Sequence, residues 1–109
     1  MDEPFFKMLM FAGEGDENLD ELIGLGYFKK IDGTICRTNK FLEETGRFID
    51  DKKESVYQAV KELGSAENME AVMEKAGIKD FITFIFVAEE LVGDGRLVKD
   101  KVKNVVPGQ

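Results

Sequence analysis

The chain has 109 residues, of which 43% are hydrophobic and 34% are charged, and its net charge is -7 at pH 7. This length and composition suffice to bury one hydrophobic core and lie outside the disordered class. We therefore expect a single domain over residues 1–109. Its apolar stretches are far shorter than the roughly 20 residues of a membrane span, and its acidic start lacks the basic region of a signal peptide.

The residue types that are missing exclude several kinds of catalytic site. The chain has no histidine and one cysteine, Cys36. Without histidine, this chain alone cannot form a Ser-His-Asp or Cys-His site, nor a histidine-ligated zinc or haem site. A lone cysteine cannot form an internal disulfide. We expect a cytoplasmic protein in which Cys36 is half-buried in a strand.

The first 26 residues predict two short helices. Asp2 and Pro4 are typical of a helix cap and first turn, and the apolar residues that follow predict a short helix that ends at Gly13. A second short helix is expected to begin near Asp16 or Asn18.

A basic β-hairpin is expected at about residues 27–37. Asp32 and Gly33 form a strong two-residue turn signal, and the segments on both sides are rich in β-branched and aromatic residues. Residues 22–40 carry four basic residues and one acidic residue, so this segment is net positive in an acidic chain. The four basic residues are Lys29, Lys30, Arg37 and Lys40.

The long apolar periodicity that follows the hairpin predicts the best-supported helix. Thr38 is a residue typical of an N-cap, and helical spacing continues up to Gly64. We expect one long packed helix or two in succession, because Gly46 weakens the helix in its first half. Ser65 is expected to start another short helix, which ends before Gly77.

Residues 81–87 give conflicting signals. Their β-propensity is high, but the helical spacing of apolar residues persists to Val92, which is longer than a usual strand. We predict a helix that Asp80 caps and Gly93 ends. One face of this helix is expected to carry Phe81, Phe84, Ile85, Ala88, Leu91 and Val92. Since the other faces are also apolar, the helix belongs at the centre of the fold or in a dimer interface.

The whole pattern predicts a mainly α-helical domain of four to six helices with one short β-hairpin, or an α+β fold if residues 81–87 form a strand. The chain has nine Phe and five Met, and no recognisable catalytic apparatus. We therefore expect a non-enzymatic protein–protein interaction or regulatory module that forms a homodimer. We assign it no catalytic, cofactor-binding or metal-binding residues.

The alternative function is nucleic-acid binding through the basic hairpin at residues 27–40. The helix end, hairpin and next helix of residues 22–45 resemble the corresponding part of winged-helix DNA-binding domains. The resemblance implies backbone phosphate contacts by Lys29, Lys30, Arg37 and Lys40. We disfavour this function because only about 21 residues precede the segment, and they are acidic where a recognition helix is basic.

A third hypothesis is an enzyme that uses carboxylates to hold magnesium. Its candidate residues are Asp16, Glu17, Asp20 and Glu21, or Asp50 and Asp51. Such clusters are usually solvated helix surface. A calcium-binding EF-hand loop from Asp16 is excluded, because its sixth position is Glu21 and its twelfth is Tyr27.

Overall fold

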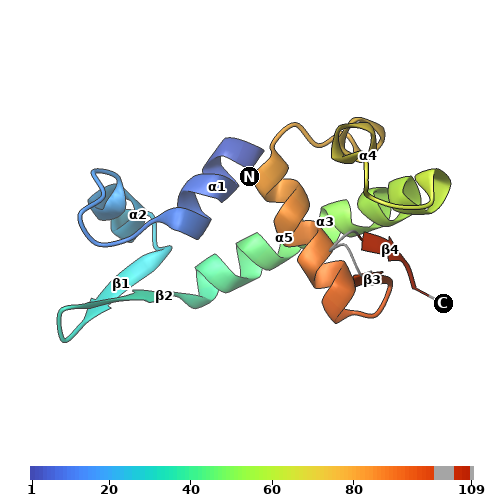
Figure 1. The fold of residues 1–109 in the computed structure, drawn as a ribbon. Coiled ribbons are helices and arrows are strands. Elements are labelled where there is room, and N and C mark those ends of the chain that lie inside the picture. The colour runs from blue at the N-terminus through green and yellow to red at the C-terminus, as the bar shows by residue number, and fades with distance from the viewer. Residues whose placement is uncertain (100–104, 109) are drawn as a thin grey trace. The chain divides into compact units, whose positions relative to one another are not determined.

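The computed structural model describes residues 1–99 and 105–108 (Figure 1). These residues form five helices and two antiparallel β-hairpins. The prediction of a mainly α fold with a short β-hairpin is confirmed, and the second hairpin was not predicted. The chain gathers into two compact units, residues 1–48 and 49–109. The single domain over residues 1–109 therefore stays a prediction. Within the described residues, no helix combines the length and hydrophobicity needed to cross a bilayer.

Helix α1 (Glu3–Phe11) begins where the sequence predicts. The Asp2 carboxylate accepts a hydrogen bond from the Phe5 N–H at 2.9 Å, and Pro4 occupies the first turn. Pro4 has no N–H to leave unsatisfied at that position, and the acidic cap is favoured by the helix dipole.

Helix α2 (Leu19–Gly24) is only six residues long. It follows Asn18, as predicted, although the Asn18 side chain makes no capping hydrogen bond. Asp16 instead accepts from the Gly13 N–H at 2.7 Å and so holds the loop before the helix. Asp16 is therefore a turn residue and not a helix cap.

The predicted hairpin is formed by β1 (Phe28–Ile31) and β2 (Thr34–Arg37). Its two turn residues, Asp32 and Gly33, have positive φ angles of 52° and 79°. Positive φ at both positions is what a two-residue hairpin turn requires, and Asp-Gly supplies it at low steric cost.

Aromatic rings make up much of the core of residues 1–48. The Phe28 and Phe41 ring centroids are 5.3 Å apart, and Phe5 packs edge-on against Tyr27 at 5.5 Å. Such offset and edge contacts add to the free energy gained by burying the rings. The buried members of this cluster are Leu9, Leu19, Leu22, Tyr27, Phe28 and Phe41.

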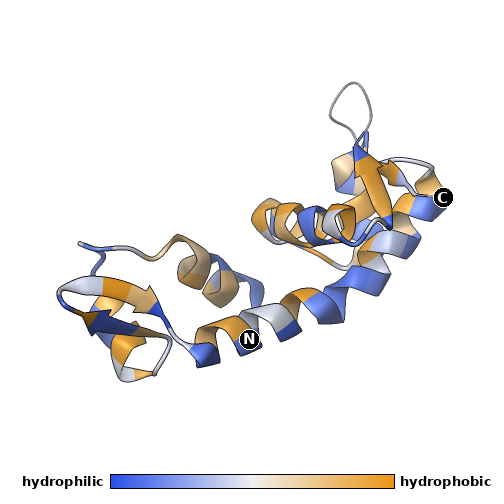
Figure 2. Cartoon of the chain, turned by 90° about the horizontal axis from the view of Figure 1, so that it is seen from below, coloured by the Kyte–Doolittle hydropathy of each residue, from blue (hydrophilic) through white to orange (hydrophobic). Residues whose placement is uncertain are grey.

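Helix α3 (Asn39–Leu63) runs without interruption, so the sequence forms one long helix and not two. The Thr38 hydroxyl accepts from the Phe41 N–H at 3.3 Å, which confirms the predicted cap. Gly64, with φ 82°, follows its last residue. Figure 2 shows hydrophobic and hydrophilic segments along this helix, as expected for a helix with one buried side.

Helix α4 (Met69–Ala76) begins later than predicted. Its N-cap is Asn68, whose side chain accepts from the Ala71 N–H at 3.2 Å. The predicted start at Ser65 is wrong, because that hydroxyl accepts from the Glu67 N–H in the turn before the helix.

Helix α5 (Phe81–Gly93) confirms the predicted helix and excludes the strand at residues 81–87. The Asp80 carboxylate caps it by accepting from the Ile82 N–H at 2.8 Å. After it, β3 (Leu97–Lys99) pairs with β4 (Val105–Pro107). Leu97 at the start of β3 is fully buried.

Candidate functional site

The predicted basic residues of the hairpin lie on different faces. Residues that pair across antiparallel strands point to the same face, and neighbours along a strand point to opposite faces. Lys30 pairs with Ile35, which packs on the core, whereas Lys29 pairs with Cys36 on the outer face. Lys29 and Lys30 are exposed, and neither has a hydrogen bond or ion pair within the described part of the chain.

The other two candidate residues interact with neighbouring rings. The Arg37 guanidinium lies 4.5 Å from the centroid of the Phe41 ring. The Lys40 ammonium lies 4.6 Å from the Tyr27 ring centroid and donates to the Leu25 carbonyl at 2.6 Å. These cation–π contacts hold both side chains against their own unit. Of the four basic residues, only Lys29 and Lys30 have no partner among the described residues, so the hairpin does not present a row of four available cations.

Cys36 is half-buried in β2, as predicted. Its thiol lies 3.8 Å from the Thr34 carbonyl oxygen.

A half-buried hydrogen bond joins Tyr27 to α3. The Tyr27 hydroxyl donates to the Glu44 carboxylate at 2.6 Å. This hydrogen bond, together with burial of the ring and the negative charge of Glu44, raises the pKa of Tyr27 above its ordinary value of 10.0. All three causes favour the protonated phenol. The Tyr27 hydroxyl therefore keeps its proton and donates to Glu44 in the folded protein near neutral pH.

We expect Tyr27 to make the protein less stable at alkaline pH. Above about pH 10 the unfolded chain releases the tyrosine proton while the folded chain keeps it, so the free energy of unfolding falls as pH rises. Tyr27→Phe should lower the free energy of unfolding by about 1 kcal/mol at pH 7. Between pH 7 and 11 the free energy of unfolding of this variant should fall less than that of the wild type. Urea denaturation from pH 7 to 11 measures both, with Tyr57→Phe as control. Identical pH profiles for the two variants would contradict the assignment.

Helices α4 and α5 are joined by a four-residue turn, residues 77–80. Gly77 takes a left-handed φ of 73°, and Ile78 is buried in the turn. A glycine-containing turn of this length is typical of helix-turn-helix motifs. Ala66, before α4, donates to the Val105 carbonyl of β4 at 2.9 Å.

The surface of α5 differs from that of a nucleic-acid recognition helix. Phe81 is 46% exposed and Ile85 is 36% exposed, one helical turn apart. Ile82 and Phe86 beside them are half-buried, and the next turn carries the exposed Glu89. The α5 sequence has no lysine or arginine, so this helix has no cation to neutralise a phosphate. Its exposed face is apolar and then acidic.

Arg96 and Lys99, the basic residues after α5 that the structure describes, are paired within their own unit. Arg96 lies 3.4 Å from the Glu54 carboxylate, and Lys99 lies 3.2 Å from the Glu89 carboxylate. Such exposed pairs contribute little free energy, but they lower the positive charge that the β3–β4 hairpin offers to another molecule.

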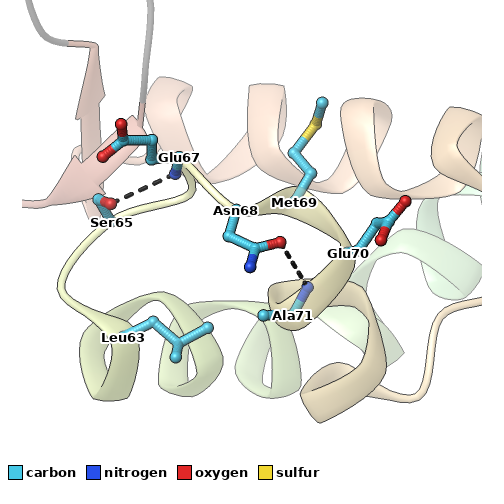
Figure 3. A pocket seen from close by; sticks show the side chains of 7 residues that line it. All are labelled: Leu63, Ser65, Glu67, Asn68, Met69, Glu70 and Ala71. Atoms are coloured by element: carbon cyan, nitrogen blue, oxygen red, sulfur yellow. Dashed lines mark hydrogen bonds between the residues drawn. The ribbon is translucent and has the colours of Figure 1, made fainter.

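A shallow pocket of about 670 Å³ opens where α3 ends and α4 begins (Figure 3). Leu63 and Met69, 41% and 39% exposed, are its large apolar residues. The carboxylates of Glu67 and Glu70 have no hydrogen bond or ion pair within the described ranges. Its lining residues are Leu63, Ser65, Glu67, Asn68, Met69, Glu70 and Ala71. The pocket therefore combines exposed apolar surface with two carboxylates that no described residue neutralises.

The carboxylate clusters are exposed helix and loop surface. The N-terminal cluster, Asp16, Glu17, Asp20 and Glu21, is exposed, and Asp50 pairs with Lys53 at 3.3 Å. Among residues 1–99 and 105–108, no three Cys, Asp or Glu side chains are grouped so that they could hold a metal ion.

Comparison of the chain with family models, curated proteins and solved structures found no match.

Proposed function

We propose that the protein is a non-enzymatic, cytoplasmic protein–protein interaction module that forms a homodimer through α5. The observation that carries this proposal is the exposed apolar row of Phe81 and Ile85 on the second helix of the helix-turn-helix. Large exposed apolar side chains at neighbouring positions of one helix face are typical of a protein interface.

A second copy fits this row better than a charged partner does. In a two-fold symmetric interface the same surface packs against itself. The first two turns of α5 carry no charged side chain, so two such faces can meet without like-charge repulsion. The acidic Glu89 and Glu90 follow in the third turn. An antiparallel arrangement would place these carboxylates at the outer ends of the contact.

Replacing Phe81 and Ile85 by glutamate should weaken the dimer by at least tenfold in Kd, because charged groups would have to be desolvated in the interface. Glutamate is compatible with the helix and favoured near its N-terminus, so α5 should remain folded. Sedimentation velocity over a concentration series measures the dissociation constant. Leu42→Glu is the matched control, since Leu42 is 58% exposed on α3. A wild-type chain that stays monomeric at high concentration would overturn the proposal.

Nucleic-acid binding is the second candidate, favoured by the helix-turn-helix spacing and by Lys29 and Lys30, which have no partner in the described part of the chain. Weighing against it are the absence of a basic residue on α5 and the internal contacts of Arg37 and Lys40. A gel-shift series with a short DNA duplex at low salt tests it. A complex that weakens steeply with added salt would support this function, and no complex at low salt would remove it.

A further inference from the structure

The outer face of the β1–β2 hairpin carries an apolar and a basic residue side by side. Lys29 and Ile31 are two positions apart in β1, so both point to the face opposite the core, roughly 7 Å apart. Ile31 is 49% exposed, although it is a large apolar residue next to a tight turn. Lys29 has no partner within the described residues. The hairpin thus offers the apolar side chain of Ile31 and the ammonium of Lys29 on the same surface.

The pocket before α4 has the complementary character. Leu63 and Met69 provide exposed apolar surface, and methionine adapts readily to the shape of an incoming side chain. Glu67 and Glu70 provide two carboxylates without a partner in the described chain. Figure 3 shows the side chains of the seven residues that line this pocket. Opposite charges beside apolar surfaces favour one docking partner over others.

We propose that the outer face of the hairpin of one copy docks in the pocket before α4 of a second copy. Ile31 contacts Leu63 and Met69, and the Lys29 ammonium pairs with the carboxylates of Glu67 and Glu70. In a two-fold symmetric dimer this exchange occurs twice, which doubles its contribution. The inference rests on the proposed homodimer and adds a second, charge-dependent contact to the apolar contact of α5.

Reversing one charge on the hairpin should weaken self-association. Lys29→Glu places a carboxylate next to Glu67 and Glu70, and we expect the dimer Kd to rise at least fivefold at low salt. Lys30→Glu is the matched control, because it makes the same change of charge at the neighbouring position on the opposite face of the strand. Sedimentation velocity measures both. Equal effects of the two variants, or no effect of Lys29→Glu, would overturn the proposal.

Complementary charge reversal tests whether the contact joins two copies. Glu67→Lys/Glu70→Lys should also weaken self-association, because its pocket repels Lys29. A mixture of this variant with Lys29→Glu should form a heterodimer, since each hairpin then meets a pocket of opposite charge. A mixture that stays dissociated, while circular dichroism shows both chains folded, would overturn the exchange. Glu67→Gln/Glu70→Gln removes the charge without reversing it, and its Kd should lie between those of the wild type and the charge-reversal variant. This variant keeps the test usable if the charge reversal perturbs α4.

The two proposed contacts can fail separately. A dimer that dissociates with Phe81→Glu/Ile85→Glu but ignores Lys29→Glu would overturn the hairpin contact and retain the contact of α5. A dimer that responds to Lys29→Glu and is rescued by the complementary mixture, but ignores the changes on α5, would support the hairpin contact and overturn the role of α5.

Discussion

Replacement of Phe41 by alanine is expected to lower the free energy of unfolding by about 3–5 kcal/mol, the usual cost of removing a buried aromatic ring. Phe41 is 1% exposed, and its ring packs against Phe28 on one side. The Arg37 guanidinium stacks on the same ring and would lose that contact. The cavity would therefore open where β1, β2 and α3 meet. Urea denaturation followed by circular dichroism measures the change.

Leu42→Ala is the control for this variant, because it removes an apolar side chain from the next position of the same helix. Leu42 is 58% exposed, so its loss should change the free energy of unfolding by no more than about 0.5 kcal/mol. Similar losses for the two variants would mean that Leu42 is also buried, and would contradict the orientation of α3.

In residues 49–109, Leu97→Ala is expected to have the largest effect, a loss of about 2–5 kcal/mol. Leu97 is fully buried, although it lies at the start of a strand of only three residues. Its side chain anchors β3, which packs against α5. Val98→Ala is the matched control, since Val98 is 45% exposed at the next position. Equal losses in urea denaturation would contradict the placement of β3.

Local signals in the sequence predicted the elements whose ends are fixed by local hydrogen bonds. Asp2 and Asp80 cap their helices as expected, because each carboxylate accepts from an N–H two or three residues later. The hairpin turn at Asp32 and Gly33 was predictable for the same reason, since it depends on the φ preferences of two neighbouring residues.

The start of α4 depends on a contact that no local pattern contains. Ser65 and Asn68 are both residues that cap helices, and Ser65 was the predicted start. In the structure the Ala66 N–H donates to the Val105 carbonyl, so residue 66 is joined to β4 in the segment before the helix begins. The partner lies 39 positions along the chain, in a hairpin that was not predicted.

In the candidate site, too, local sequence patterns identified residues but not the contacts that they make. The charge pattern identified the four basic residues of the hairpin, but not that Arg37 and Lys40 would lie over the rings of Phe41 and Tyr27. Periodicity placed Phe81 and Ile85 on the buried face of α5 together with Leu91. The structure buries Leu91 and leaves the other two exposed, because burial also depends on which neighbours cover each turn of the helix. Sequence periodicity defines a face but not how much of it is covered.

The boundary between residues 48 and 49 falls inside α3, not in a loop. A chain divided at that peptide bond would leave the last four carbonyls of one fragment and the first four N–H groups of the other without their helical partners. It would also separate Phe48 and Ile49, both of which are buried. Neither half is therefore expected to fold when it is cut at this boundary. A fusion of either half to another protein would have to include additional turns of α3.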